Sequence, residues 1–180
     1  FLKAIMPILI IPIVTTVIVG LGYIYILANP LGGVVNALTN GLNSLSGGST
    51  VILAIAIGCM IAFDMGGSVN KVAFATASAL IATGNTEMMG MTGVAICVPP
   101  IGMGIASMLL KKKFTPEEQE AGKAAAAMGL IGITEGAIPF AASDPLRVLP
   151  SIMAGSSVGA IIAGLAGCTD AAPHGGLIVL

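Results

Sequence analysis

The sequence predicts an all-α membrane protein, with multiple transmembrane helices, re-entrant hairpins and one interfacial amphipathic helix. Of its 180 residues 56% are apolar and only 8% charged, whereas about a quarter of the residues in a soluble domain are charged. No charged residue lies within 4–63, 88–110 or 148–169. A spanning helix needs about 20 apolar residues, so each gap can hold at least one, and membrane lipid is an expected partner.

Composition also excludes several classes of function. The net charge is -1, and no basic stripe with interleaved aromatics is present, so we expect no nucleic acid partner. The cysteines, Cys59, Cys97 and Cys168, lie scattered in apolar runs without metal-ligand spacing. The pattern therefore predicts no metal and no cofactor.

The first half of the chain predicts a spanning helix, an amphipathic helix and two short apolar segments separated by a polar break. Residues 4–27 read as a spanning helix that Asn29-Pro30 ends. Within 31–45, leucine and valine recur at helical spacing, which predicts an amphipathic helix in the membrane interface, or alternatively one packed on other helices. Two short apolar runs, 50–63 and 72–83, flank "FDMGGSVNK". They fit discontinuous helices and, equally, two helices joined by a plain loop.

The second half predicts one full span and a hairpin. Residues 88–110 form the span, and the lysines that follow it place residues 111–123 on the cytoplasmic side. Thr115 and Pro116 read as the start of the next helix. The short apolar run 124–133 then meets "GITEGAIPFAASDPLR", whose glycines and prolines predict a re-entrant hairpin. Small residues at every fourth position of 151–167 predict close helix packing.

Ionisable side chains in a membrane are costly and usually face a cavity or a partner. The isolated acids are Asp64, Glu87, Glu135, Asp144 and Asp170, and their possible partners are Lys71, Arg147 and His174. For Glu135 we favour a substrate ligand over a helix cap, because one carboxylate can accept hydrogen bonds from several sugar hydroxyls.

The other polar residues divide between structure and binding. Asp144 and Arg147 are three residues apart, so a local ion pair or cap that holds the hairpin is favoured. His174 fits a structural role or a hydrogen-bonding and proton-handling role equally well. Asn70 and Lys71 fit hydroxyl binding, and Lys71 alternatively extends to the interface.

Three stretches in this order, "FDMGGSVNK", "GKAAAAMGLIGITEGAIPFAASDPLRVLPSI" and "APHGG", resemble the membrane (IIC) component of the fructose family of phosphoenolpyruvate-dependent sugar phosphotransferase systems. The similarity covers essentially the whole chain. Two positions depart from the family pattern: Ser68 stands where proline is common, and Ser143 where alanine is common. These departures leave the identity of the sugar undetermined.

The resemblance implies an all-α, multi-pass protein of the bacterial inner membrane, a homodimer that binds fructose or a related hexose derivative and moves it inward. It implies that the IIB and IIA phosphocarrier domains are partners and that a IIB phosphocysteine phosphorylates the sugar. That cysteine is absent here, so the chain is not expected to be a catalyst alone. Related transporters place the glutamate of a GITE-like motif on the sugar, which makes Glu135 the first candidate ligand and a possible base. His174, Asn70 and Asp64 follow as further substrate-binding candidates.

Residues 1–180 are expected to be a single membrane-embedded region, part of a larger IIC domain truncated at both ends. An ion-coupled secondary transporter or channel, with Asp64, Glu135 and His174 as a relay, is the alternative, and a noncatalytic membrane scaffold is a second.

Overall fold

A computed structural model describes residue 6 and residues 10–45 and 48–179. The chain divides into two compact units, Phe1–Ala37 and Leu38–Leu180. Every regular element in the described ranges is helical, which confirms the all-α prediction. Among the described residues, three helical stretches are long and apolar enough to cross a membrane: Ile11–Leu45, Glu87–Leu109 and Pro145–Leu165.

In the first unit, the expected helix break at Asn29-Pro30 is wrong. Helix α2 (Ile11–Gly22) continues through a π-helical turn, η2 (Tyr23–Leu27), into α3 (Ala28–Leu45). A proline inside a helix lacks its own N–H and collides with the carbonyl four residues earlier. For Pro30 that carbonyl belongs to Ile26, which lies in the π turn. A π turn has hydrogen bonds between residues five apart in place of the α-helical bonds between residues four apart. The helix can therefore continue through Pro30.

The end of α3 uses its apolar face for packing. Leu42 is 2% exposed within a core of buried side chains, and Leu38 and Leu45 pack against the same core. These leucines all belong to the second unit. Their packing corresponds to the alternative reading of the amphipathic segment, in which it lies against other helices.

Helices α4 (Thr50–Asp64) and α5 (Ser68–Ile81) form a short hairpin joined by a glycine-containing turn. Met65 and Gly66 in that turn have φ values of +42° and +106°, a region that L side chains rarely adopt. Both helices are apolar but shorter than a full span. The predicted break at "FDMGG" is therefore present, and the polar start of α5 lies beside it.

Helix α6 (Glu87–Leu109) contains both Pro99 and Pro100 and matches the predicted span. A short 3₁₀ turn, η3 (Lys111–Lys113), carries the lysines, and α7 (Pro116–Leu130) begins at Thr115 with the predicted cap. After α7 the helix breaks. A 3₁₀ turn, η4 (Thr134–Ala137), and a short helix, α8 (Ile138–Ser143), precede α9 (Pro145–Leu165).

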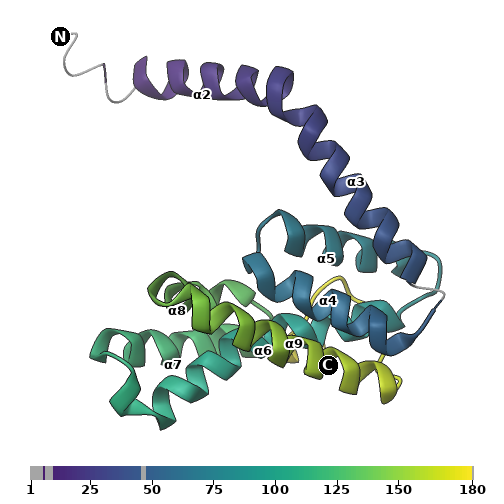
Figure 1. Cartoon of the computed structure of the whole chain (residues 1–180), viewed down its shortest axis with the longest axis vertical. Coiled ribbons are helices and arrows are strands. Elements are labelled where there is room, and N and C mark those ends of the chain that lie inside the picture. Colours follow the sequence, from purple (N-terminus) through teal and green to yellow (C-terminus); the bar gives the residue numbers. More distant parts are fainter. Residues whose placement is uncertain (1–5, 7–9, 46–47, 180) are drawn as a thin grey trace. The chain divides into compact units, whose positions relative to one another are not determined.

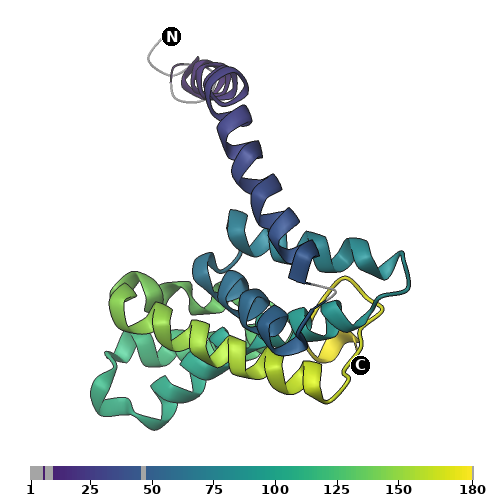
Figure 2. The same cartoon turned by 45° about the vertical axis from the view of Figure 1, so that its right-hand side comes forward.

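Helix α9 packs against both α4 and α6, as the two views show (Figures 1 and 2). Small residues on both helices allow α4 and α9 to approach closely: a Cβ on Gly58 of α4 would lie 2.7 Å from the Ser156 carbonyl carbon of α9. The Ser156 hydroxyl donates to the Ala95 carbonyl of α6 at 3.1 Å.

The predicted close packing of 151–167 is confirmed at Gly155 and Gly159, where a Cβ would lie 3.3 and 2.9 Å from the Val98 side chain of α6. It is not found at Gly167, where a Cβ would meet no atom within 4 Å.

After α9 the chain runs through a loop to a last 3₁₀ turn, η5 (Leu177–Val179). This yellow segment folds back beside the helices of the second unit (Figure 2). A Cβ on Gly90 of α6 would lie 2.7 Å from the carbonyl carbon of Cys168 in the loop. The loop is therefore held on α6, which places His174 within the folded unit.

Candidate functional site

A cavity of about 360 Å³ lies in the second unit and gathers polar residues from four parts of the chain. Its volume falls at the low end of ligand pockets, which span about 300–1,000 Å³. The lining comes from α5, α6, the break at η4 and the C-terminal loop: Asn70, Lys71, Phe74, Ile96, Gly132, Ile133, Thr134, Glu135 and His174. Glu135, His174 and Asn70, all predicted from the sequence, are thus brought together.

Glu135 lies on η4, the short 3₁₀ turn at the break between α7 and α8. Its carboxylate makes no hydrogen bond or ion pair with any of the described residues. The turn before α5 approaches it so closely that a Cβ on Gly66 would lie 2.9 Å from the carboxylate carbon. The carboxylate is therefore an acceptor with unused capacity at the cavity wall.

Asn70 is 3% exposed and held in one orientation. Its side-chain Nδ2 donates to the Ile61 carbonyl of α4 at 2.7 Å. That bond assigns the other end of the amide as oxygen, and an amide oxygen accepts hydrogen bonds. Asn70 therefore presents an acceptor, and a ligand hydroxyl would have to donate to it.

Contacts between glycine backbones place His174 at the cavity. A Cβ on Gly132 would lie 2.6 Å from the Gly175 carbonyl carbon, and one on Gly175 would lie 2.6 Å from the Gly93 carbonyl oxygen. Gly132 and Gly176 also have φ values of +79° and +87°. We call Gly93, Gly132, Gly175 and Gly176 the glycine contact. It fixes the loop that carries His174 against α6 and the break that carries Glu135.

Lys71 contributes the positive charge of the lining. Its ammonium nitrogen lies 5.8 Å from the centroid of the Phe74 ring, within the range of a cation–π contact. Lys71 is otherwise exposed and has no ion-pair partner among the described residues. The site therefore combines a donor, Lys71, with the acceptors on Glu135 and Asn70.

Asp64 is not part of the cavity lining. Its carboxylate accepts hydrogen bonds from the backbone N–H groups of Val69 and Asn70, at 2.8 and 2.9 Å. These are donors that the first turn of a helix cannot satisfy internally. The structure thus gives Asp64 a capping role at α5, and its assignment as a sugar ligand remains a prediction.

We expect Asp64→Ala to lower the free energy of unfolding by about 1–2 kcal/mol, because a helix cap is lost. Sugar affinity should fall only slightly, through the loosened first turn at Asn70. Thermal unfolding in detergent and a binding titration measure the two effects separately. Asp64→Asn retains one acceptor oxygen, so its free energy of unfolding should lie between those of the wild type and Asp64→Ala. Normal stability with abolished sugar binding in Asp64→Asn would instead identify Asp64 as a ligand.

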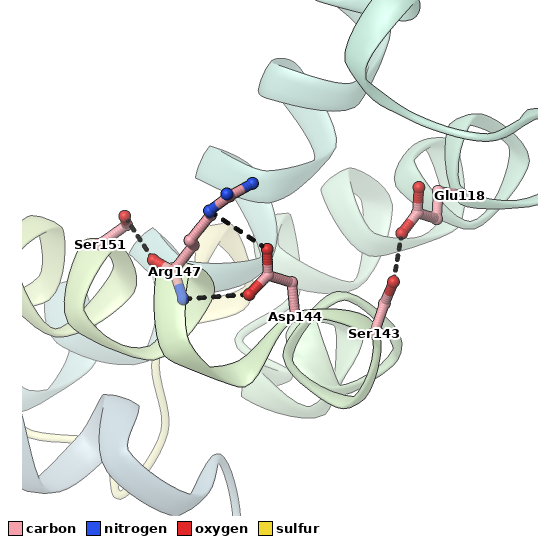
Figure 3. Close-up of polar contacts among 5 residues, drawn as sticks. All are labelled: Glu118, Ser143, Asp144, Arg147 and Ser151. Carbon is pink, nitrogen blue, oxygen red and sulfur yellow. Dashed lines mark hydrogen bonds and ion pairs between the residues drawn. The ribbon is translucent and has the colours of Figure 1, made fainter.

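Asp144 and Arg147 lie at the junction of α8 and α9 (Figure 3). Arg147 Nε is 3.6 Å from Asp144 Oδ2, and the Arg147 backbone N–H donates to Asp144 Oδ1 at 3.3 Å. Both side chains lie outside the lining of the cavity. The expected ion pair and helix cap are present, and a role for them in holding the hairpin remains a prediction.

A hydrogen bond ties this junction to the start of α7 (Figure 3). The Ser143 hydroxyl donates to Glu118 Oε1 at 2.8 Å, while Glu118 Oε2 accepts from the Thr115 backbone N–H. The Thr115 bond, followed by the Ser143 bond, holds the pKa of Glu118 below its usual range. Ser143, where alanine is common in the resembling family, therefore has a defined contact.

We expect Ser143→Ala to raise the pKa of Glu118 toward its ordinary value, because one donor to the carboxylate is removed. With its pKa lowered in the fold, Glu118 stabilises the protein above its unfolded pKa of about 4.3. That contribution is lost as the pH falls through the lower folded pKa. Carboxyl NMR titration checks the shift. Ser151→Ala is the control, because Ser151 donates to the Arg147 carbonyl; equal Glu118 titration in both variants would contradict the prediction.

A larger cavity of about 750 Å³ lies beside α6 and the C-terminal loop. Its wall is mainly glycine and aliphatic side chains, among them Val94, Val98 and Ile101. A ligand rich in hydroxyls needs convergent polar groups, which the smaller cavity has and this one largely lacks. We therefore place the candidate site in the smaller cavity.

Sequence reasoning missed part of the lining. Thr134, Phe74 and Ile96 belong to the wall and were not singled out. The position of Thr134 beside Glu135 was a signal for it, whereas Phe74 and Ile96 reach the cavity only through the packing of α5 and α6. Within the described ranges no three histidine, cysteine, aspartate or glutamate side chains form a candidate metal site.

Curated relatives match this chain over nearly its full length. It is 51% identical over 179 residues to the "Fructose-like permease IIC component 2" of Escherichia coli (strain K12), covering 99% of this chain and 50% of that protein. It is 39% identical over 181 residues to the "PTS system fructose-specific EIIC component" of Haloferax volcanii, covering 100% of this chain and 48% of that protein. Over the part of their length that it spans, the chain is homologous to fructose-type IIC components.

A further relative of the IIC family is a longer protein. The "PTS system fructose-specific EIIB'BC component" of Rhodobacter capsulatus is 42% identical over 179 residues, covering 99% of this chain and 31% of that protein. The chain thus spans half or less of the length of these relatives. No family model and no solved structure matches it.

Proposed function

We propose that this chain forms the sugar-binding part of a phosphotransferase-system permease in the cytoplasmic membrane. The protein takes up fructose or a related hexose derivative and presents it for phosphorylation. The observation that carries this proposal is the cavity in which Glu135, His174 and Asn70 converge within a chain homologous to fructose-type IIC components. Lipid surrounds the spans, and a homodimer is the proposed assembly.

The chemistry of the lining suits a neutral, hydroxyl-rich ligand. Glu135 and the Asn70 oxygen accept hydrogen bonds from sugar hydroxyls, while Lys71 and His174 can donate to them. Phe74 and Ile96 supply an apolar wall for the C–H faces of the ring. Small ligand sites commonly combine such walls with a few placed polar groups.

Phosphorylation requires a second domain. We propose that a IIB phosphocysteine transfers its phosphoryl group to one sugar hydroxyl: the S–P bond breaks, an O–P bond forms, and Glu135 takes the hydroxyl proton as general base. Names such as EIIB'BC and EIIABC among the relatives support IIB and IIA domains as partners. The chain alone supplies the path and the pocket.

Radiolabelled fructose uptake into right-side-out membrane vesicles, loaded with the phosphocarrier proteins and phosphoenolpyruvate, tests this function. With the phosphocarrier proteins present, uptake should depend on phosphoenolpyruvate and yield sugar phosphate. It should persist when protonophores and ionophores collapse the ion gradients. Uptake of unmodified sugar that follows an ion gradient would overturn the proposal in favour of a secondary transporter.

A further inference from the structure

Thr134 is the first residue of η4 and precedes Glu135 directly. It is 4% exposed and lines the cavity. Its side chain makes no hydrogen bond with any of the described residues. The buried threonines of regular helices behave differently, because Thr76 and Thr92 each donate to the carbonyl four residues earlier at 2.8 Å.

The local backbone explains why Thr134 lacks such a bond. Ile133, just before it, is extended, with φ -110° and ψ 101°, so no helical turn precedes Thr134. A buried hydroxyl without a partner is destabilising, because it has given up its hydrogen bonds to water. Every side-chain polar atom that is fully sealed from solvent in the described ranges has a partner. The Thr134 hydroxyl is therefore not fully shielded from solvent. Thr134 lines the cavity, so a ligand in the cavity can reach this hydroxyl.

We propose that Thr134 is a substrate-contacting residue whose hydroxyl exchanges a hydrogen bond with one hydroxyl of the sugar and helps to select which sugar is held. The inference rests on the proposed function and adds a residue to its site. Glu135 and the Asn70 oxygen can only accept, whereas a threonine hydroxyl both donates and accepts. Thr134 can thus donate a hydrogen bond to a sugar oxygen, which those two acceptors cannot do.

Thr134→Val tests the contact, because it keeps the shape and removes the hydroxyl. The Kd for the sugar should rise about 2- to 10-fold, as expected for one hydrogen bond. KM should rise with kcat little changed, since the contact is present before and during transfer. Thr134→Ser should restore wild-type affinity. Thr76→Val is the matched control, a buried threonine outside the cavity, and should bind as the wild type does.

A series of monodeoxy sugars sharpens the test. For the analogue that lacks the contacted hydroxyl, wild type and Thr134→Val should bind equally, while the difference persists for the other analogues. Equal binding of every sugar by wild type and Thr134→Val would overturn the inference, as would a penalty identical for the whole series or one that serine fails to rescue. If the wild type binds no sugar, the proposed function fails and this inference with it.

Discussion

Glu135→Gln is expected to weaken sugar binding by about 10- to 100-fold, the effect of losing hydrogen bonds to a charged acceptor. The amide keeps the size of the side chain but replaces one acceptor oxygen by a donor. Because Glu135 makes no bond to the described protein, the fold should be unaffected. Isothermal titration with the sugar, together with thermal unfolding, measures both quantities.

The same variant separates binding from base catalysis. If Glu135 takes the proton of the attacked hydroxyl, the rate at saturating sugar should also fall, by about 10²-fold or more. Glu87→Gln is the control, because Glu87 is another isolated acid, at the start of α6 and outside the cavity lining. Wild-type affinity in Glu135→Gln would remove Glu135 from the site. Weak binding with a normal rate at saturation would remove only the base role.

Gly132→Ala should reduce sugar affinity at least about tenfold, because it disrupts the glycine contact. Alanine at φ +79° is strained by about 1–2 kcal/mol. Its Cβ would also overlap the Gly175 carbonyl, so the loop bearing His174 must move. Sugar titration and thermal unfolding of the variant in detergent check the prediction.

Two comparisons isolate the cause of that loss. Gly167 has a similar φ, +67°, but a Cβ there would meet no atom within 4 Å, so Gly167→Ala carries strain without a collision. It should retain sugar affinity. In a His174→Ala background, Gly132→Ala should cost little further affinity, because the two changes act through one residue. Equal affinity in Gly132→Ala and Gly167→Ala would contradict a positioning role for the glycine contact.

Much of the fold follows from local patterns. The span at 88–110, the helix start at Thr115 and the break at "GITEG" were all predictable, because charge gaps, caps and glycines act over short range. The helix break at Pro30 was predicted wrongly. A π turn is set by the bonding of the preceding residues and leaves no clear mark in composition.

The site was predictable in its chemistry but only partly in its geometry. The free energy needed to place an ionisable side chain in an apolar run marks such a residue as unusual, and this signal singled out Glu135 and His174. The structure brings both side chains to one cavity. Asp64 carried the same signal; its carboxylate caps α5, and its role as a sugar ligand stays a prediction. The sequence does not distinguish a carboxylate used as a cap from one that faces a cavity, because that depends on how the "FDMGG" turn folds.

A structure of the protein with its sugar bound tests the central claim most directly. We expect the sugar in the cavity between α5 and η4, with at least one hydroxyl oxygen about 2.5–3.0 Å from a Glu135 carboxylate oxygen. The same sugar should approach the Asn70 oxygen and the Thr134 hydroxyl. A sugar bound in the larger apolar cavity beside α6, or anywhere that leaves Glu135 without contact, would contradict the assignment of this cavity as the sugar site.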